Sequence, residues 1–191
     1  MRSEVKKAAV LIPFIIKDNR LHLILTLRNQ NLSQHGGQIC FPGGRQEEKE
    51  NLLETALREA EEEIGLNKDA VEIIAELQDE MAYVSSYLIK PFVGLIKNDL
   101  DLKRNEKEVK EIIVLPFDEL LSLPLKMEST VVRGREISYP VYNWRGYRIW
   151  GATARILSKL LERKDVIDEL NRRAHVHIGG NMEGNRARRG T

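Results

Sequence analysis

Residues 44–66 read GRQEEKENLLETALREAEEEIGL. The middle part of this stretch predicts a helix over Asn51–Ile64, because apolar side chains recur there at intervals of three and four residues. Gly65 is suited to end this helix, since glycine readily adopts the left-handed conformation of a C-terminal cap. We therefore expect an amphipathic helix that packs one face on a core. Its apolar positions are Leu53, Ala56, Leu57, Ala60 and Ile64.

The segments on either side of this helix are rich in strand-forming residues. Ala8–Ile16 and Leu21–Leu27 flank a polar turn sequence and predict a hairpin. A second long helix is expected from about Ala152 to Arg172. Because strands surround two substantial helices without regular β-α alternation, the sequence predicts an α+β fold. Further expected elements are strands at Gln38–Phe41, Val71–Leu77, Tyr87–Ile96 (broken by Pro91 and Gly94) and Glu111–Leu115, a short helix at Phe117–Leu121, and two or three strands within Val131–Trp150.

Three acidic residues, Glu59, Glu62 and Glu63, share one stripe of the predicted helix. Like charges one turn apart repel by ~0.2–0.5 kcal/mol per pair, and acids in the last turn oppose the helix dipole by ~0.3–1 kcal/mol each. A solvated acidic face is the ordinary explanation, but the stripe itself carries no Lys or Arg. Acids that repel one another and oppose the helix dipole in this way often mark a functional site. A divalent cation would relieve the repulsion. Oxygen ligands without His or Cys favour Mg²⁺, or Mn²⁺ in its place, over Zn²⁺.

The turn Pro42-Gly43-Gly44 precedes the helix and lets the backbone approach a ligand closely. A carbonyl group in this turn could complete the coordination of a metal. Arg58 lies one turn before Glu62, so we expect it to form ion pairs along the helix while staying off the carboxylate stripe. Its expected role is mainly that of a scaffold.

The whole stretch matches, at every defined position, the pattern Gly-x5-Glu-x7-Arg-Glu-U-x-Glu-Glu-x-Gly-U, in which U is aliphatic. This pattern is long and rarely met by chance, and the chain resembles the Nudix hydrolases. The resemblance implies an α/β/α sandwich around a mixed β-sheet and Mg²⁺-assisted hydrolysis of a nucleoside diphosphate linked to another group. It also implies that Glu59 and Glu63 are the principal metal ligands, with Glu62 as an additional ligand or base. Glu50 and Arg58 would brace the loop against the helix.

Such a hydrolysis needs a general base that takes a proton from the attacking water. In Nudix enzymes this base comes either from the sequence pattern given above, which is called the Nudix box, or from a loop later in the chain. Glu106 and Glu108 precede the strand expected at Glu111–Leu115 and are the candidates in a later loop. A charged surface loop over Asp99–Lys110 is the more ordinary interpretation of the same residues.

A second resemblance concerns the substrate. Leu25–Asn29 and the spacing Gly37-x3-Phe41-Pro42-Gly43-Gly44 resemble the signature of the coenzyme A pyrophosphatase branch, which reads Leu-Leu-Thr-x-Arg-Ser-x3-Arg-x3-Gly-x3-Phe-Pro-Gly-Gly. This likeness implies that coenzyme A or an acyl-CoA is cut to 3′,5′-ADP and (acyl-)4′-phosphopantetheine. Arg28 would then contact a phosphate, although an exposed Arg at the end of a strand is an equally good interpretation.

The signature is incomplete. Ile24 replaces its first Leu and Asn29 its Ser, while Ser33 stands where the second Arg belongs. The last change matters most, because it removes a cation that could hold an anionic substrate. ADP-ribose, a dinucleoside polyphosphate or a nucleoside triphosphate therefore remain alternative substrates. Tyr83 could stack on a base in any of them, or belong to the core or rim.

Composition narrows the class of protein. The 191 residues suffice for one compact domain, and we expect it over residues 1–173, followed by a basic, mobile tail over 174–191. With 30 Lys and Arg against 29 Asp and Glu, the net charge of +1 gives no global preference for nucleic acid or an anionic membrane. No apolar run is long enough to span a bilayer. Cys40 as the single cysteine fits a reducing compartment, and we expect a cytoplasmic protein.

Two other classes of function stay open at this stage. The domain could bind a nucleotide without hydrolysing it and act as a sensor, although a binding module would not need the mutual repulsion of the box carboxylates. The basic tail could bind RNA, but it lacks aromatic residues for base stacking. The expected partner is thus a small nucleotide substrate, with a homodimer as an additional possibility.

Overall fold

The first two strands form the hairpin on which the sheet is built. The computed structural model describes residues 5–31, 36–82, 85–96, 101–132 and 134–187. Strand β1 (Lys6–Lys17) pairs antiparallel with β2 (Arg20–Arg28), with Phe14 opposite Leu23. Asp18 and Asn19 between them both have positive φ, as a two-residue hairpin turn requires. The predicted hairpin is therefore confirmed.

Strands from both halves of the chain complete a mixed eight-stranded sheet. Its main order is β3-β2-β1-β7-β5, in which β1 and β7 are parallel and the other neighbours are antiparallel. Strand β4 pairs with β1, β6 with β7, and β8 with β2. The strands added to the hairpin are β3 (Ile39–Cys40), β4 (Gly43–Arg45), β5 (Val71–Glu76), β6 (Glu80–Ala82), β7 (Tyr87–Ile96) and β8 (Val109–Pro116).

Strand β7 is continuous, so the break expected at Pro91 and Gly94 is wrong. Pro91 lies opposite Val10 of β1, and its carbonyl accepts a hydrogen bond from the backbone N–H of Leu77 in the gap between β5 and β6. The missing N–H of proline is tolerated there, because Pro91 faces the gap between β5 and β6 and no strand in that gap requires a hydrogen bond from it. At Gly94, a Cβ would overlap a methyl group of Val71, so glycine allows close packing inside the sheet.

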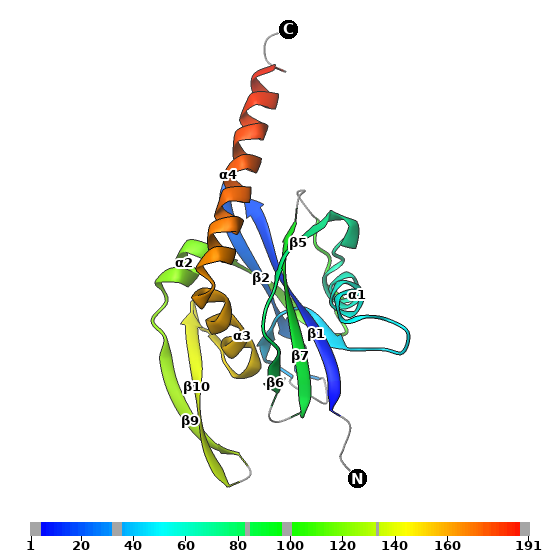
Figure 1. Cartoon of the computed structure of the whole chain (residues 1–191), viewed down its shortest axis with the longest axis vertical. Coiled ribbons are helices and arrows are strands. Elements are labelled where there is room, and N and C mark those ends of the chain that lie inside the picture. Colours follow the sequence, from blue (N-terminus) through cyan, green and yellow to red (C-terminus); the bar gives the residue numbers. More distant parts are fainter. Residues whose placement is uncertain (1–4, 32–35, 83–84, 97–100, 133, 188–191) are drawn as a thin grey trace.

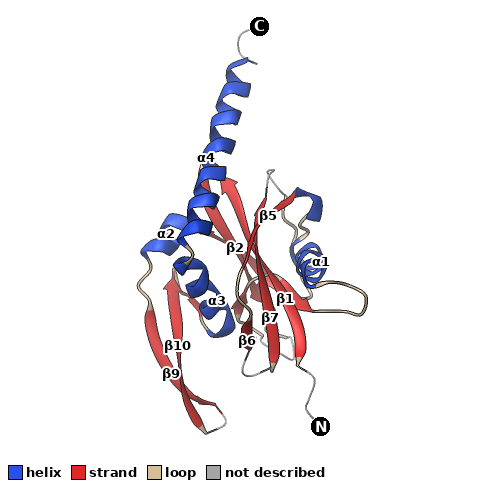
Figure 2. Ribbon diagram, in the orientation of Figure 1, coloured by secondary structure: helices blue, strands red, loops and turns tan. Residues whose placement is uncertain are grey.

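Helices cover both faces of the sheet (Figure 1). Helix α1 (Leu52–Ile64) lies on one face, and α3 (Gly151–Glu162) lies on the opposite face. The helix-strand-helix layering stands out in the colouring by secondary structure (Figure 2). The sequence-based expectation of an α+β fold with an α/β/α sandwich around a mixed sheet is confirmed.

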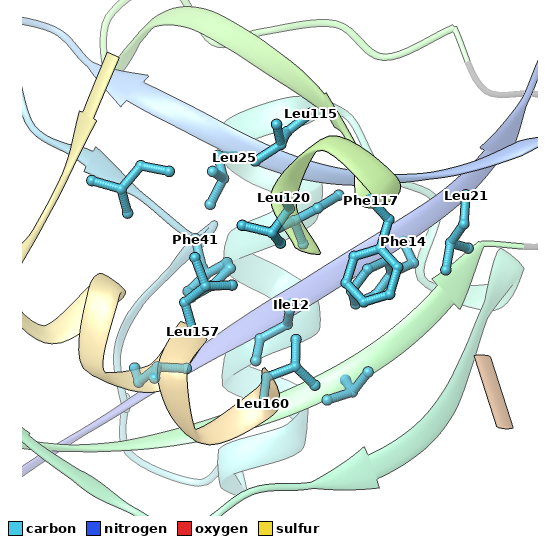
Figure 3. Close-up of a cluster of buried hydrophobic side chains, with 14 of the residues drawn as sticks. Ile12, Phe14, Leu21, Leu25, Phe41, Leu115, Phe117, Leu120, Leu157 and Leu160 are labelled. Carbon is cyan, nitrogen blue, oxygen red and sulfur yellow. The ribbon is translucent and has the colours of Figure 1, made fainter. Parts of the chain in front are cut away.

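Each face of the sheet has its own core because side chains alternate along a strand. Leu11 of β1 packs with Ala56 and Ala60 of α1. Its neighbour Ile12 belongs to the opposite cluster, together with Leu160 of α3. Figure 3 shows this second cluster, in which Ile12, Phe14 and Leu25 from the sheet lie near Leu157 and Leu160 of α3 and near Phe117 and Leu120 of the short helix α2 (Phe117–Ser122).

The remaining elements lie outside the central sheet. Strands β9 (Lys126–Val132), β10 (Arg135–Trp144) and β11 (Tyr147–Ile149) form a separate antiparallel sheet in the order β11-β10-β9. A 3₁₀ turn over Lys68–Ala70 connects α1 with β5.

The C-terminal part contains two helices and not the single one predicted. Helix α3 ends at Glu162, and α4 (Lys164–Ala187) begins after Arg163, whose guanidinium binds Asp165 in the first turn of α4. Because α4 runs to Ala187, most of the segment expected as a tail is helical (Figure 1). The mobility of that segment remains a prediction. None of the helices in the described ranges is long and apolar enough to cross a membrane.

Candidate active site

Helix α1 is fixed at both ends by caps that the sequence supplies. Asn51 accepts hydrogen bonds from the N–H groups of Leu53 and Glu54, and the Glu54 side chain accepts one from the N–H of Asn51. This is a capping box, which satisfies N–H groups that have no partner within the helix. Gly65 ends the helix with φ of 68°. The predicted helix and its C-terminal cap are confirmed.

The carboxylate of Glu63 is the most deeply buried acid of the helix, with 1% of its side chain exposed. Its Oε1 accepts a hydrogen bond from Nη1 of Arg28 at 3.1 Å, and its Oε2 accepts one from the N–H of Gly43 at 3.3 Å. Burial raises the pKa of Glu63 to about 7, and the positive charge of Arg28 opposes this shift. Glu63 therefore joins α1, the end of β2 and the beginning of β4 at one point.

Glu59 lies one turn earlier, against the backbone of Gly44. A Cβ at Gly44 would overlap the Glu59 carboxylate, so any larger residue at this position would displace that side chain. Oε1 of Glu59 lies 3.0 Å from Nη1 of Arg58. Burial also raises the pKa of Glu59, against the effect of Arg58. Strand β4 and the helix thus approach each other closely at the acidic stripe.

Glu62 lies at the open edge of the site, with 54% of its side chain exposed. Its Oε2 accepts a hydrogen bond from Nη1 of Arg58 at 3.1 Å. The same guanidinium contacts both Glu59 and Glu62. The expected ion pair with Glu62 is therefore confirmed, whereas the expectation that Arg58 stays off the stripe is wrong. A long side chain with five N–H donors reaches carboxylates on either side of its own helical position.

Glu50 and Arg58 form a two-point ion pair between the loop and the helix. Nε of Arg58 donates to Oε2 of Glu50 and Nη2 donates to Oε1, both at 3.0 Å. Glu50 also accepts hydrogen bonds from the hydroxyl of Thr55 and the N–H of Glu47, each at 2.8 Å. Chiefly through the bonds from Arg58, the pKa of Glu50 is lowered to about 2. A further bond from Arg58 to the carbonyl of Arg45 ties this pair to β4.

Arg28 pairs with Glu63 at the buried end of the stripe. It is the last residue of β2, its side chain is 23% exposed, and it lies beside Cys40 of the neighbouring strand β3. The alternative of an exposed Arg at a strand end does not hold. Burial raises the pKa of the Cys40 thiol to about 11, which disfavours the thiolate that a nucleophilic cysteine needs.

The two acids proposed from the later loop occupy different surroundings. Glu108 is half-buried, and its backbone carbonyl accepts a hydrogen bond from the N–H of Asn29, the residue after Arg28. Its negative charge contributes to the raised pKa values of Glu59 and Glu63. Glu106 is exposed and pairs with Arg104 at 3.1 Å. The structure therefore brings Glu108 to the site and leaves Glu106 on the surface.

The comparison with known families agrees with this geometry. The NUDIX domain family matches residues 5–133, which include α1, β4 and the strand that carries Arg28. The chain belongs to the Nudix family.

Curated Nudix relatives match over most of their length. A protein of Photorhabdus laumondii named "Uncharacterized Nudix hydrolase NudL" is 37% identical over 163 residues, which cover 84% of this chain and 86% of the relative. A protein of the same name from Yersinia enterocolitica is 35% identical, covering 83% of this chain and 82% of the relative.

Solved Nudix structures share the fold at low sequence identity. A MutT/nudix family protein from Enterococcus faecalis superimposes with a TM-score of 0.57 at 14% identity, covering 88% of this chain and 64% of the other. An Ap4A hydrolase from C. elegans gives 0.51 at 17% identity, with 60% and 83% covered. The NUDIX domain of Shewanella oneidensis NrtR, solved with ADP ribose, gives 0.50 at 16% identity, with 65% and 80% covered.

Helix α1, which we call the Nudix helix, offers ligands that suit a hard divalent cation. Within the described parts of the chain, no three His, Cys, Asp or Glu side chains converge in the arrangement of a metal site. The stripe itself carries no Lys or Arg, as expected, but its carboxylates pair with Arg28 from β2 and with Arg58 from the adjacent helical position. All the side-chain donors are nevertheless carboxylate oxygens, and the missing Cβ of Gly44 leaves its backbone against Glu59. This donor chemistry fits Mg²⁺ or Mn²⁺.

Two residues considered from the sequence, Ser33 and Tyr83, lie outside the described residues.

One residue with several contacts at the Nudix site was missed. Asn105, in the loop before β8, bonds to the end of α1 and to Glu108. The only sequence signal for it was indirect, namely that the carbonyl groups at the end of α1 need donors from elsewhere.

Proposed function

We propose that this protein is a Mg²⁺-dependent hydrolase that cleaves the pyrophosphate of coenzyme A or an acyl-CoA to 3′,5′-ADP and (acyl-)4′-phosphopantetheine. The observation that carries the proposal is the junction at Glu63, where the Nudix helix meets Arg28 and Gly43. These two residues belong to the stretches that resemble the coenzyme A pyrophosphatase signature. One junction thus combines the hydrolytic box with the residues that suggest the substrate.

Glu59 and Glu63, with Glu62 and the carbonyl of Gly44, would hold the cation. When bound, Mg²⁺ supplies neutralisation of the phosphate oxygens and orientation of the attacking water, and Mn²⁺ can take its place. The arginines that now pair with these carboxylates provide part of the compensating charge. Glu50 and Arg58 keep the loop and β4 braced against the helix in this scheme.

Two side chains and two glycines of the protein would assist the reaction. Glu108 takes a proton from the water whose oxygen attacks one phosphorus of the pyrophosphate. The bond between that phosphorus and the bridging oxygen breaks, and the leaving phosphate carries the electron pair away. Arg28 contacts a phosphate oxygen, because a guanidinium suits planar recognition of phosphate. The absence of side chains at Gly43 and Gly44 permits close approach of the backbone.

ADP-ribose is the second candidate substrate. It contains the same adenosine diphosphate unit, and the NUDIX domain of NrtR, which shares the fold, was solved with ADP ribose. Ser33, at the position where the signature has Arg, removes one cation that would favour coenzyme A. Dinucleoside polyphosphates and nucleoside triphosphates present the same phosphate chemistry and complete the set of alternatives.

The test compares kcat/KM for coenzyme A, ADP-ribose, diadenosine polyphosphates and nucleoside triphosphates with Mg²⁺ present. The proposal expects the highest value for coenzyme A or an acyl-CoA. A higher value for another substrate would keep the Nudix hydrolysis and discard the coenzyme A assignment. If the protein binds these nucleotides but hydrolyses none of them, with or without Mg²⁺, it acts as a sensor and the enzymatic proposal fails.

A further inference from the structure

The loop between β7 and β8 completes the end of the Nudix helix. The helix ends at Gly65, so the last carbonyl groups of α1 have no partners within the helix and need donors from other segments. The backbone N–H of Lys103 donates to the carbonyl of Ile64 at 3.0 Å, and that of Asn105 donates to the carbonyl of Glu63 at 2.9 Å. Asn105 is therefore attached directly to the backbone of the most buried acid of the stripe.

The other polar groups of Asn105 bind residues 107–109, and two of them contact Glu108. Its Nδ2 donates to Oε1 of Glu108 at 3.2 Å. Its carbonyl accepts from the N–H groups of Glu108 at 3.0 Å and Val109 at 2.8 Å. Its Oδ1 accepts from the N–H of Lys107 at 3.2 Å, which closes a tight turn. A single half-buried residue thus connects Glu63 with Glu108.

Glu108 is held at the site from its other side as well. Its carbonyl accepts from the N–H of Asn29 at 2.8 Å, and Arg28 pairs in the sheet with Val109. The backbone of Glu108 is therefore fixed next to the Arg28–Glu63 ion pair. Among the hydrogen bonds found for the described side chains, the one from Asn105 is the bond that restrains the Glu108 carboxylate itself.

We propose that Asn105 is a positioning residue, which holds the carboxylate of Glu108 in the orientation that the hydrolysis requires. This inference rests on the proposed function, in which Glu108 accepts the proton of the water. Fixing a Glu side chain costs conformational entropy, and the hydrogen bond from the amide of Asn105 offsets that cost before the substrate binds. Misplacement of a reacting group by about 1 Å can reduce a rate 100-fold.

Two substitutions separate this role from a purely structural one. Asn105→Ala removes both side-chain bonds but keeps the backbone bonds to Glu63, Glu108 and Val109. Asn105→Asp keeps an oxygen that can accept from Lys107 and so preserves the turn, but it has no N–H for Glu108. If the side chain only closes the turn, Asn105→Asp should behave like the unmodified protein. If it positions Glu108, both variants should be impaired.

The decisive experiment is a double-mutant cycle in kcat between Asn105→Ala and Glu108→Gln, with Glu106→Ala as the control from the same loop. We expect Asn105→Ala and Asn105→Asp to lower kcat about tenfold, a loss of orientation smaller than full displacement, with KM and the midpoint of Mn²⁺ binding within about twofold. In the Glu108→Gln background, Asn105→Ala should cause no further loss, because the residues act as a unit. Glu106→Ala should have normal kinetics.

The cycle is run with the substrate that gives the highest rate among those compared above, so failure of the coenzyme A assignment does not prevent it. Losses that multiply in the double mutant, or a normal rate for Asn105→Asp, would each overturn the role of Asn105 and leave the hydrolase proposal intact. A normal rate for Glu108→Gln would overturn the role of Asn105 and also remove Glu108 as the base, while Mg²⁺-dependent hydrolysis would still stand. Absence of Mg²⁺-dependent hydrolysis of every substrate would overturn both.

Discussion

Nη1 of Arg28 lies 3.1 Å from Oε1 of Glu63, an acid with 1% of its side chain exposed. The two residues are 35 positions apart, and the fold brings them together where β2 ends beside the last turn of α1. Removing one partner of a buried ion pair leaves the other charge uncompensated. This pair therefore links the stability of the Nudix helix to the residue that we propose as a phosphate contact.

Glu63→Gln should abolish most Mg²⁺-dependent turnover while leaving the fold intact. The amide keeps an oxygen that can accept from Arg28, but it lacks the charge needed to bind a cation. Loss of a few kcal/mol of stabilisation corresponds to a decrease of about 100-fold or more in kcat. Steady-state kinetics and circular dichroism of this variant check the prediction, with the exposed Glu61→Gln as the control. Near-normal turnover by Glu63→Gln would refute its role as a metal ligand.

Arg28→Ala should raise KM for coenzyme A more than it lowers kcat. The guanidinium uses Nη1 for Glu63 but remains partly exposed, so it can also contact a phosphate of the substrate. Loss of a hydrogen bond to a charged group costs about 1.5–3 kcal/mol, which corresponds to an increase of roughly 10- to 100-fold in KM. Saturation curves with coenzyme A measure this effect. An unchanged KM would remove Arg28 from the substrate site.

Gly44→Ala should weaken metal binding, because the added methyl group overlaps the Glu59 carboxylate and displaces it. We expect the Mg²⁺ concentration for half-maximal activity to rise about tenfold or more, a loss of at least ~1.4 kcal/mol. Arg45→Ala, one residue further along the same strand and exposed, is the matched control. Identical Mg²⁺ titrations for Gly44→Ala and Arg45→Ala would argue against a contribution of this position.

The Glu50–Arg58 pair predicts how stability depends on pH. The pKa of Glu50 is about 2 in the folded protein and 4.5 without the pair, so its contribution is complete above about pH 4.5 and is lost as the pH falls towards 2. Because the pair is partly open to water, Glu50→Gln should reduce the free energy of unfolding at pH 7 by about 1–2 kcal/mol.

Urea unfolding at pH 7 and pH 3.5 tests this prediction. The difference between Glu50→Gln and the unmodified protein should be smaller at pH 3.5, and Glu48→Gln, an exposed acid of the same loop, should show little difference at either pH. A difference that stays constant or grows at the lower pH would contradict the assigned cause.

The sequence predicted those features that depend on local pattern. The bounds of α1, its cap at Gly65 and the first hairpin follow from apolar spacing and turn residues. The α/β/α layering followed from the Nudix resemblance. The contacts of α1 with β4 could be anticipated only in outline, from the two glycines before the helix.

The errors concern contacts between distant segments. Pro91 reads as a strand breaker, and its place in the gap between β5 and β6 is determined by the neighbouring strands. The ion pair between Arg28 and Glu63 was not predicted, because Arg28 comes from a strand that lies 35 positions earlier in the chain. Asn105 carried no local signal, since its importance arises where the loop meets the helix. The apolar spacing continues past Arg163, so it gave no indication that the C-terminal helix divides there.

The most direct test of the central claim is chromatographic analysis of the products formed from coenzyme A with Mg²⁺, and with EDTA in its place. We expect equal amounts of 3′,5′-ADP and 4′-phosphopantetheine with Mg²⁺ and no products with EDTA. Unchanged coenzyme A in the presence of Mg²⁺, under conditions in which ADP-ribose or another nucleotide is cleaved, would contradict the coenzyme A assignment.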